Sequence, residues 1–320
     1  MNLFGAFLRL IRWPNLVFIG LAQFLFYYCI QLPSFHHADN GAMTNVLTLK
    51  YFWLLSFSSV LIASAGYIIN DYFDLNIDTI NKPERIIVEK LIKRRWTILW
   101  HWILSGLGIL LGFYISWRIR NPIIGFSNLI CVTMLWFYST TFKRKLLIGN
   151  VIVSLLTAWV ILVLYACEFR LHRLVDPAYQ HSLGRVYKFA VLYAAFAFII
   201  SLVREVVKDM EDMTGDESLG CRTMPIVWGI PASKVFAGTW LVVLMGALIV
   251  IQFYVLQYRW WISIAYTWVA IIIPIVWLLI RLRKAVTRGD YHHLSQLIKM
   301  LMLTGMMSMI FFKWYTSWIA

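Results

Sequence analysis

Two groups of acidic residues with the same spacing are the part of this sequence best suited to chemistry. Both groups read D-x-x-D-x-x-x-D, and their members are Asp71, Asp74 and Asp78 in the first and Asp209, Asp212 and Asp216 in the second. Positions i, i+3 and i+7 lie on one face of a helix, so each group is expected to point its carboxylates in one direction. Eleven of the 15 acidic residues fall within 71–89 or 205–217, so acid is concentrated at two places.

Carboxylates gathered in this way repel one another unless cations lie between them. Ligation by oxygen alone favours hard ions, and Mg²⁺ in particular is held by a few carboxylates while water or substrate phosphates fill its other positions. Basic residues also flank both groups, which the metal alone does not require and which a bound polyanion explains. These residues are Lys82, Arg85, Lys208, Arg204 and Arg222. The combination predicts a site for Mg²⁺ and a diphosphate.

The elements that must position these residues are membrane helices. Apolar residues make up 61% of the chain and charged residues 14%, with a mean hydropathy of +0.73, which excludes a soluble enzyme, a secreted module or a disordered tail. Nine apolar runs each approach the roughly 20 residues that a bilayer crossing needs. The predicted spans are 14–33, 51–70, 97–117, 121–140, 146–168, 186–204, 234–257, 260–280 and 295–318. We therefore predict an all-α polytopic membrane protein, with 1–320 as a single domain and an apolar substrate chain lying among the helices.

The distribution of positive charge predicts how the chain is oriented. Nine crossings place the two termini on opposite sides, and roughly two thirds of the Lys and Arg residues fall on the side of the N-terminus. The N-terminus and the two acidic loops, 71–96 and 205–233, are therefore expected in the cytoplasm, in a protein of the inner membrane. The net charge of +14 forms no basic stripe with interleaved aromatic residues, so nucleic acid is not an expected partner. No obligatory protein partner is evident.

The two acidic groups and their flanks resemble the motifs of the UbiA superfamily of intramembrane prenyltransferases, and the resemblance covers nearly the whole chain. The first family motif, NDxxDxxxD, stands at 70–78 and continues as Asn81-Lys82-Pro83-Glu84-Arg85, similar to the family's NKPxR extension. The second stands at 209–216, preceded by Lys208. The resemblance implies a nine-helix bundle around a central cavity, in which Mg²⁺ bridges an isoprenyl diphosphate to both motifs.

The resemblance also implies roles for individual residues. Metal ligation falls on the six motif aspartates, and diphosphate binding falls on Lys82, Arg85 and Lys208. Asn70 is expected beside the metal ligands and is also a substrate-binding candidate. The residues expected to carry catalysis are Asp74, Asp212, Lys208 and Arg85. After Arg85 the chain continues with Ile-Ile-Val where many members have proline, which puts the conformation of this loop in doubt.

Four further residues are expected to bind substrate. The segment 138–150 is similar to the family's connection between the fourth and fifth helices, which makes Tyr138, Lys143 and Asn150 candidates. Arg204 occupies a position where many members have tyrosine, four residues before the motif lysine.

The resemblance implies Mg²⁺-assisted departure of diphosphate from an allylic carbon and attack by an acceptor on the cation-like centre. The string 204–212, with 215–216 and 223–226, is similar to the branch that prenylates geranylgeranylglyceryl phosphate, so a prenylglyceryl phosphate lipid is the preferred acceptor. Related strings in chlorophyll and tocopherol branches leave an aromatic or quinone precursor, or chlorophyll-type esterification, as alternatives. A secondary transporter is the non-enzymatic alternative, but it predicts acids deep within the spans rather than at one mouth.

Some polar residues outside the motifs also carry expectations. Arg12 fits an interfacial belt at the start of the first span, where Asn15 is a candidate to face the cavity. Lys299 falls inside the last predicted span. Glu168 and Asp176 are predicted to lie in a solvated outer loop.

Overall fold

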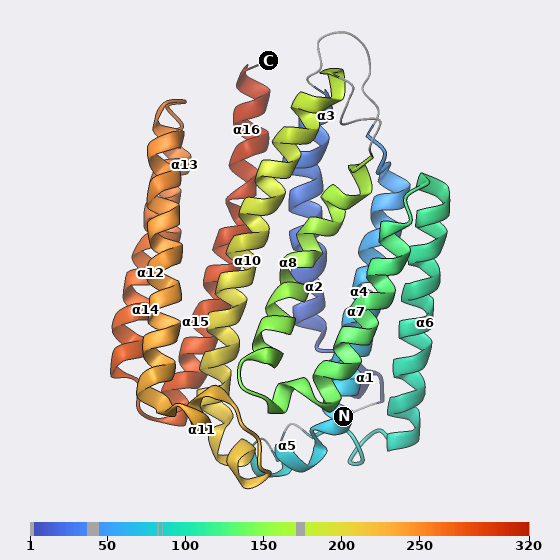
Figure 1. The fold of residues 1–320 in the computed structure, drawn as a ribbon, viewed down its shortest axis with the longest axis vertical. Coiled ribbons are helices and arrows are strands. Elements are labelled where there is room, and N and C mark those ends of the chain that lie inside the picture. The colour runs from blue at the N-terminus through green and yellow to red at the C-terminus, as the bar shows by residue number, and fades with distance from the viewer. Residues whose placement is uncertain (1–2, 37–44, 82, 85, 171–176, 320) are drawn as a thin grey trace.

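The chain forms a bundle of helices, most of which run along one long axis (Figure 1). The structure, a computed structural model, describes residues 3–36, 45–81, 83–84, 86–170 and 177–319. Lys82, Arg85 and Asp176, for which predictions are made above, lie outside these ranges.

Nine helical stretches in the described ranges are long and apolar enough to cross a membrane. They are Trp13–Phe35, Leu49–Phe73, Arg94–Ile119, Ile123–Thr140, Ile148–Glu168, Tyr179–Ser218, Gly229–Leu256, Trp261–Lys284 and Arg288–Trp314. Each predicted span overlaps one of these stretches, so the prediction of an all-α fold with nine crossings is confirmed.

The membrane stretches are built from single helices or from helices joined end to end. The helices are α2 (Trp13–Phe26), η1 (Tyr27–Gln31), α3 (Leu32–His36), α4 (Leu49–Phe73), α6 (Arg94–Ile119), α7 (Ile123–Thr140), α8 (Ile148–Glu168), α10 (Pro177–Ser218), α12 (Gly229–Leu256), α13 (Trp261–Thr267), η3 (Trp268–Ile272), α14 (Ile273–Lys284), α15 (Arg288–Met307) and α16 (Met309–Ile319). Short helices occupy the connections at one end of the bundle, and these are α1 (Leu3–Leu10), α5 (Leu75–Asn81), η2 (Phe142–Arg144) and α11 (Met224–Val227).

The outer surface of the bundle is apolar, whereas close contacts inside it use small residues. Trp117 is 74% exposed and Val250 is 69% exposed, which is stable against lipid hydrocarbon but not against water. A β-carbon at Gly108 would lie 2.6 Å from a side-chain carbon of Ile62, so α4 and α6 approach each other more closely than larger residues permit. Both features are those of a helix bundle in a bilayer.

Both acidic groups lie at the end of the bundle that carries the N-terminus, and the C-terminus lies at the other end (Figure 1). The first group spans the end of α4 and the start of α5, and the second lies near the end of α10. The 42 residues of α10 extend over about 63 Å, about twice the thickness of a bilayer's hydrocarbon core. The predicted placement of the two groups at one end is therefore confirmed.

The first acidic group does not lie on one continuous helix, which corrects the expectation from its spacing. α4 ends at Phe73 and α5 begins at Leu75, with Asp74 between them at φ −87° and ψ −1°. The Asp74 carboxylate accepts a hydrogen bond from the side chain of Asn70 at 2.7 Å, which holds it against the last turn of α4. The second group, in contrast, lies within the uninterrupted α10.

Glu168 is fully buried, so the prediction that it lies in a solvated loop is wrong. Its carboxylate accepts hydrogen bonds from the backbone N–H groups of Val46 at 3.1 Å and Leu47 at 2.9 Å. The side-chain amide of Gln31 donates a third bond at 3.0 Å. A buried carboxylate that accepts several N–H groups is compensated for its lost hydration, and here it also ties the segment just before α4 to the end of α8.

Candidate active site

The two motif segments are joined directly by the side chain of Asn81, the last residue of α5. Its amide nitrogen donates to the backbone carbonyl of Asp212 and its oxygen accepts from the backbone N–H of Gly215, each at 3.0 Å. A β-carbon at Gly215 would lie 2.5 Å from the Asn81 side chain, so only glycine permits this approach. α5 and the end of α10 are therefore side by side, as the duplicated motif predicts.

The carboxylates of the first motif contact basic side chains from other parts of the chain. A guanidinium nitrogen of Arg12 lies 2.6 Å from Asp71 Oδ1. The ammonium of Lys143 pairs with Asp74 and lies 3.4 Å from the side-chain oxygen of Asn70. The cations Arg12 and Lys143 thus reduce the repulsion between the carboxylates of Asp71 and Asp74.

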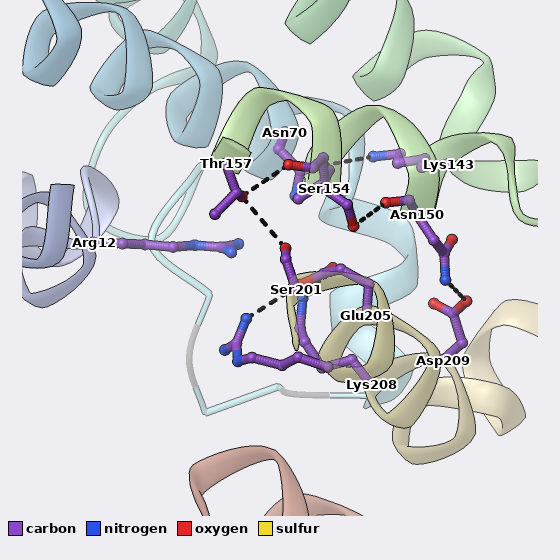
Figure 2. Close-up of polar contacts among 12 residues, drawn as sticks. Arg12, Asn70, Lys143, Asn150, Ser154, Thr157, Ser201, Glu205, Lys208 and Asp209 are labelled. Atoms are coloured by element: carbon purple, nitrogen blue, oxygen red, sulfur yellow. Dashed lines mark hydrogen bonds and ion pairs between the residues drawn. The ribbon is translucent and has the colours of Figure 1, made fainter. Parts of the chain in front are cut away.

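The second motif is held by an amide and by a more distant cation. Asn150 on α8 donates its side-chain N–H to Asp209 Oδ2 at 2.7 Å, a contact drawn in Figure 2. A guanidinium nitrogen of Arg288, at the start of α15, lies 4.0 Å from Asp212 Oδ1 and also donates to the backbone carbonyl of Asn81. Arg288 therefore contacts both motif segments, a role that its sequence position at the end of a span does not reveal.

The turn between α7 and α8 brings Lys143 and Asn150 to opposite motifs (Figure 2). The chain forms the short helix η2 and then adopts a left-handed conformation at Leu147, with φ 54°. A β-carbon at Gly149 would lie 2.8 Å from the Cα of Lys143, so glycine allows η2 to lie directly on the first turn of α8. Both residues were predicted from the 138–150 segment, and the structure places both beside motif carboxylates.

Tyr138 and Lys208 lie near the motifs, but they do not pair with a motif carboxylate as Arg12 and Lys143 do. Tyr138 is close enough to Glu205, Asp74 and Asp209 for their charges to act on its hydroxyl. Lys208 lies 3.1 Å from one oxygen of Glu205, and Arg204 lies 3.1 Å from the other. Two predicted substrate-binding cations thus share one buried carboxylate, a role for Glu205 that spacing alone does not indicate.

Arg12 is the main site residue that sequence reasoning missed. It precedes α2 in the left-handed conformation, with φ 52°, and its guanidinium also lies 5.2 Å from the centre of the Tyr67 ring. Attraction to Asp71 is the largest of the influences that raise the pKa of Arg12, so this cation keeps its charge. Its place beside tryptophan and proline at a span end is typical of an interfacial anchor, which hid the contact with the motif.

The carboxylate and amide oxygens of the two motifs are of the kind that bind a hard divalent cation. In this structure the charges of Asp71 and Asp74 are neutralised by basic side chains. Among the residues that the structure describes, no group of three or more His, Cys, Asp and Glu side chains lies close enough to hold a metal ion. Arg12 and Lys143 instead contact the carboxylates of the first motif. The remaining motif aspartates, Asp78 on α5 and Asp216 on α10, are partly buried. Carboxylate and amide oxygens are the ligands that Mg²⁺ accepts.

The fold and the site define a class: a polytopic helical membrane protein with paired acidic motifs at one end of the bundle. The pattern of the UbiA prenyltransferase family matches residues 41–303, so the chain belongs to this family of intramembrane enzymes. It is therefore a prenyltransferase, and the sequence-based resemblance is confirmed.

Two relatives share a third of their aligned residues with this chain. The digeranylgeranylglyceryl phosphate synthase of Methanothermobacter thermautotrophicus is 35% identical over 193 residues, which are 58% of this chain and 61% of that protein. The protein of the same name from Methanosarcina mazei is 34% identical over 250 residues, 77% of each chain.

Solved structures have the same fold. A structure of digeranylgeranylglyceryl phosphate synthase matches with a TM-score of 0.62 at 25% identity and covers 97% of this chain and 99% of its own. A UbiA homologue from Archaeoglobus fulgidus bound to DMAPP and Mg²⁺ matches with a TM-score of 0.54 at 15% identity, over 95% and 98% of the two chains. The second likeness supports the fold alone.

Proposed function

We propose that this protein transfers a geranylgeranyl group from its diphosphate to geranylgeranylglyceryl phosphate, in a reaction that requires Mg²⁺. The observation that carries the proposal is the direct contact of the two acidic motif segments through Asn81, with basic side chains on both. The relatives named for the digeranylgeranylglyceryl product support the choice of acceptor. An aromatic or quinone precursor is the competing acceptor, and no contact described above favours it.

The proposed metal ligands come from both motifs. They are Asp71, Asp74, Asp78, Asp209, Asp212 and Asp216, with Asp74 and Asp212 first among them. Bound Mg²⁺ supplies positive charge to the leaving diphosphate and so lowers the energy of the transition state. The Asn81 contact between the two motif segments supports a site whose metal ligands come from both.

The basic side chains would act on the departing diphosphate. Lys143 is bound to Asp74, and an ammonium displaced from that carboxylate remains within reach of the same site. Lys208 is held near the motifs by Glu205. Lys82 and Arg85 complete the proposed set by sequence position. As the C–O bond of the allylic diphosphate breaks, these cations stabilise the negative charge that develops on the leaving oxygens.

The attacking group would be the free hydroxyl of the glyceryl acceptor, whose oxygen forms the new bond to the allylic carbon. Its proton must pass to a base as the bond forms, and a motif carboxylate released from its cation is chemically suited to this. Aromatic side chains that lie near the carbon could stabilise its positive charge through their ring faces. Apolar surroundings keep water from capturing the carbocation.

The proposed orientation places this site at the cytoplasmic face of the inner membrane. The acidic motifs and the N-terminus share one end of the bundle, and most Lys and Arg residues of the loops fall on that side. Both substrates are lipids with anionic heads, so they would enter with their chains among the helices.

Turnover by the purified protein tests the proposal. In detergent with Mg²⁺ and radiolabelled geranylgeranyl diphosphate, label should move to geranylgeranylglyceryl phosphate, and Asp74→Asn or Asp212→Asn should lower the rate at least about a hundredfold. Glu217→Gln, an exposed position on α10, is the matched control and should keep the rate. Transfer of label only to an aromatic acceptor such as 4-hydroxybenzoate would replace the lipid, and full activity of both Asp variants would remove the metal assignment.

A further inference from the structure

Lys299 lies in the interior of the last membrane span, where a lysine is costly unless it has a function. It stands eleven residues after the start of α15, which corresponds to about 16 Å along the helix. Its ammonium donates to the side-chain oxygen of Asn15 on α2 at 2.8 Å and lies 4.9 Å from the centre of the Phe18 ring. No carboxylate of the described residues lies within 4.0 Å of it.

A second cation lies near Lys299 on a different helix. α15 packs antiparallel along α10: His292 lies 2.9 Å from Glu211, and a β-carbon at Gly305 would lie 2.6 Å from the Phe196 ring. Arg204 lies between those two positions of α10 and Lys299 between those of α15, so the two cations stand at the same level of the bundle. One nitrogen of the Arg204 guanidinium, Nε, is buried and has no hydrogen-bond partner among the described residues. The two cations have not been drawn together by attraction, so their proximity calls for an anion between them.

The charges in this region do not balance. Arg204 and Lys208 share the single carboxylate of Glu205, and Lys299 has only the neutral amide of Asn15. Lys208 also faces the neighbouring carboxylate of Asp209, so Arg204 and Lys299 are left with a share of one carboxylate between them, in a partly buried place with an excess of positive charge. A phosphate monoester, which carries up to two negative charges near neutral pH, matches this excess.

The region is distinct from the place where the donor's diphosphate would bind. Arg204 precedes Asp209 by five residues on the same helix, which puts it about 7.5 Å further into the bundle. The carboxylates of the first motif have their own cations in Arg12 and Lys143. An anion bound by Lys299 and Arg204 would therefore lie beside the diphosphate rather than in its place.

We propose that Lys299 and Arg204, with Asn15 orienting the Lys299 ammonium, bind the phosphate group of the acceptor lipid. The inference rests on the proposed function and specifies which part of the molecule recognises the acceptor. In a glyceryl phosphate the free hydroxyl stands within two carbons of the carbon that bears the phosphate. Anchoring the phosphate here therefore holds the attacking oxygen close to the allylic carbon of the donor.

The test is Lys299→Met, measured separately against each substrate. The KM for geranylgeranylglyceryl phosphate should rise about tenfold or more, because a charge-assisted contact to phosphate is lost, whereas the KM for geranylgeranyl diphosphate should stay within about twofold. Lys299→Arg should recover part of the loss. Lys188→Met, at an exposed position near the other end of α10, is the control for removing a lysine and should leave both constants unchanged.

A binding measurement separates failure of this inference from failure of the proposed function. Geranylgeranylglyceryl phosphate should raise the melting temperature of the wild-type protein more than geranylgeranylglycerol, which lacks the phosphate, and Lys299→Met should abolish the difference. This outcome does not depend on turnover. If the variant keeps the full difference, or if its KM rises for the diphosphate instead of the acceptor, the acceptor-phosphate site is wrong. If the wild-type protein transfers no label to the lipid, the proposed function is wrong.

Discussion

Gly215 on α10 donates its backbone N–H to the side-chain oxygen of Asn81 on α5, across 134 residues of sequence. The same side chain donates to the carbonyl of Asp212, so one asparagine binds two backbone groups of the second motif. The distance between the two acidic groups is therefore fixed by a short contact that has no room for a β-carbon.

Replacing Gly215 by alanine should separate the motif segments. The new methyl group would lie 2.5 Å from the Asn81 side chain, which must then leave one or both of its hydrogen bonds. We expect a destabilisation of about 1–3 kcal/mol and a fall in kcat of about tenfold or more, with a higher Mg²⁺ concentration needed for half-maximal rate. Thermal melting and Mg²⁺ titration of the rate measure these effects.

Gly184→Ala is the matched control for the Gly215 substitution, because Gly184 also lies on α10 and a β-carbon there would meet nothing within 4 Å. It should melt at the wild-type temperature or slightly above and keep full activity. Equal losses in the two glycine variants would mean that α10 tolerates no alanine, and the contact with Asn81 would then not be the cause.

Removing Lys143 should change how the protein responds to Mg²⁺. Its ammonium pairs with Asp74, so it competes with a metal ion for that carboxylate. In Lys143→Met we expect the Mg²⁺ concentration for half-maximal rate to fall severalfold, while kcat falls because a cation that faces the diphosphate is missing. Lys145→Met, exposed on the same turn, should alter neither value. If Lys143→Met needed the same or a higher Mg²⁺ concentration for half-maximal rate than the wild-type protein, Lys143 would not compete with the metal for Asp74.

Chelation of metal should abolish transfer and leave the fold intact. Arg12 and Lys143 neutralise the first motif when no metal is bound, so the carboxylates need not repel the segments apart. We expect EDTA to stop the reaction, added Mg²⁺ to restore it, and the circular dichroism of the wild-type protein to stay unchanged. In Arg12→Met combined with Lys143→Met, EDTA should lower the melting temperature by several degrees. If EDTA changed the melting temperature of the wild-type protein and of the double variant by the same amount, Arg12 and Lys143 would not be what stabilises the first motif in the absence of metal.

Glu168→Leu should destabilise the other end of the bundle. The change leaves the N–H group of Val46 and the amide of Gln31 without their acceptor, and leaves the N–H group of Leu47 with the side-chain oxygen of Asn45 alone. Unsatisfied buried donors cost about 1–3 kcal/mol each, so we expect a large drop in melting temperature. Activity measured well below that temperature should remain, because the acidic motifs lie at the opposite end (Figure 1). An unchanged melting temperature would show that water or lipid replaces the carboxylate.

The sequence predicts the crossings and the shared end of the motifs because both depend on properties of single residues. Transfer to lipid is roughly additive along a helix, so hydropathy alone locates nine spans. The motif spacing and the number of crossings then place the two acidic groups at one end. The resemblance also marks the segment of Lys143 and Asn150, and the structure places both beside motif carboxylates, whereas their binding of substrate stays a prediction.

The contacts that the sequence does not reveal are those that join distant residues. Glu168 lies at a span end, where exposure is the usual outcome, and its buried carboxylate is bonded by Gln31, Val46 and Leu47, all more than a hundred residues away. Arg12 has the sequence surroundings of an interfacial anchor. Its ion pair with Asp71 depends on how the helices pack together, which the hydrophobic periodicity does not predict. The break between α4 and α5 at Asp74 is also not predicted by a spacing of i, i+3 and i+7, because it depends on local interactions such as the hydrogen bond from Asn70 to the Asp74 carboxylate.

The interruption between α4 and α5 gives the two halves of the site unequal mechanical freedom. Asp209, Asp212 and Asp216 are fixed to a rigid rod that runs through the whole bundle, whereas Asp78 is carried by a seven-residue segment beyond a hinge. Any change in the spacing of the two acidic groups, as a diphosphate binds or leaves, would therefore be made mainly by a movement of α5. The hydrogen bonds of Asn81 to Asp212 and Gly215 limit how far α5 can move.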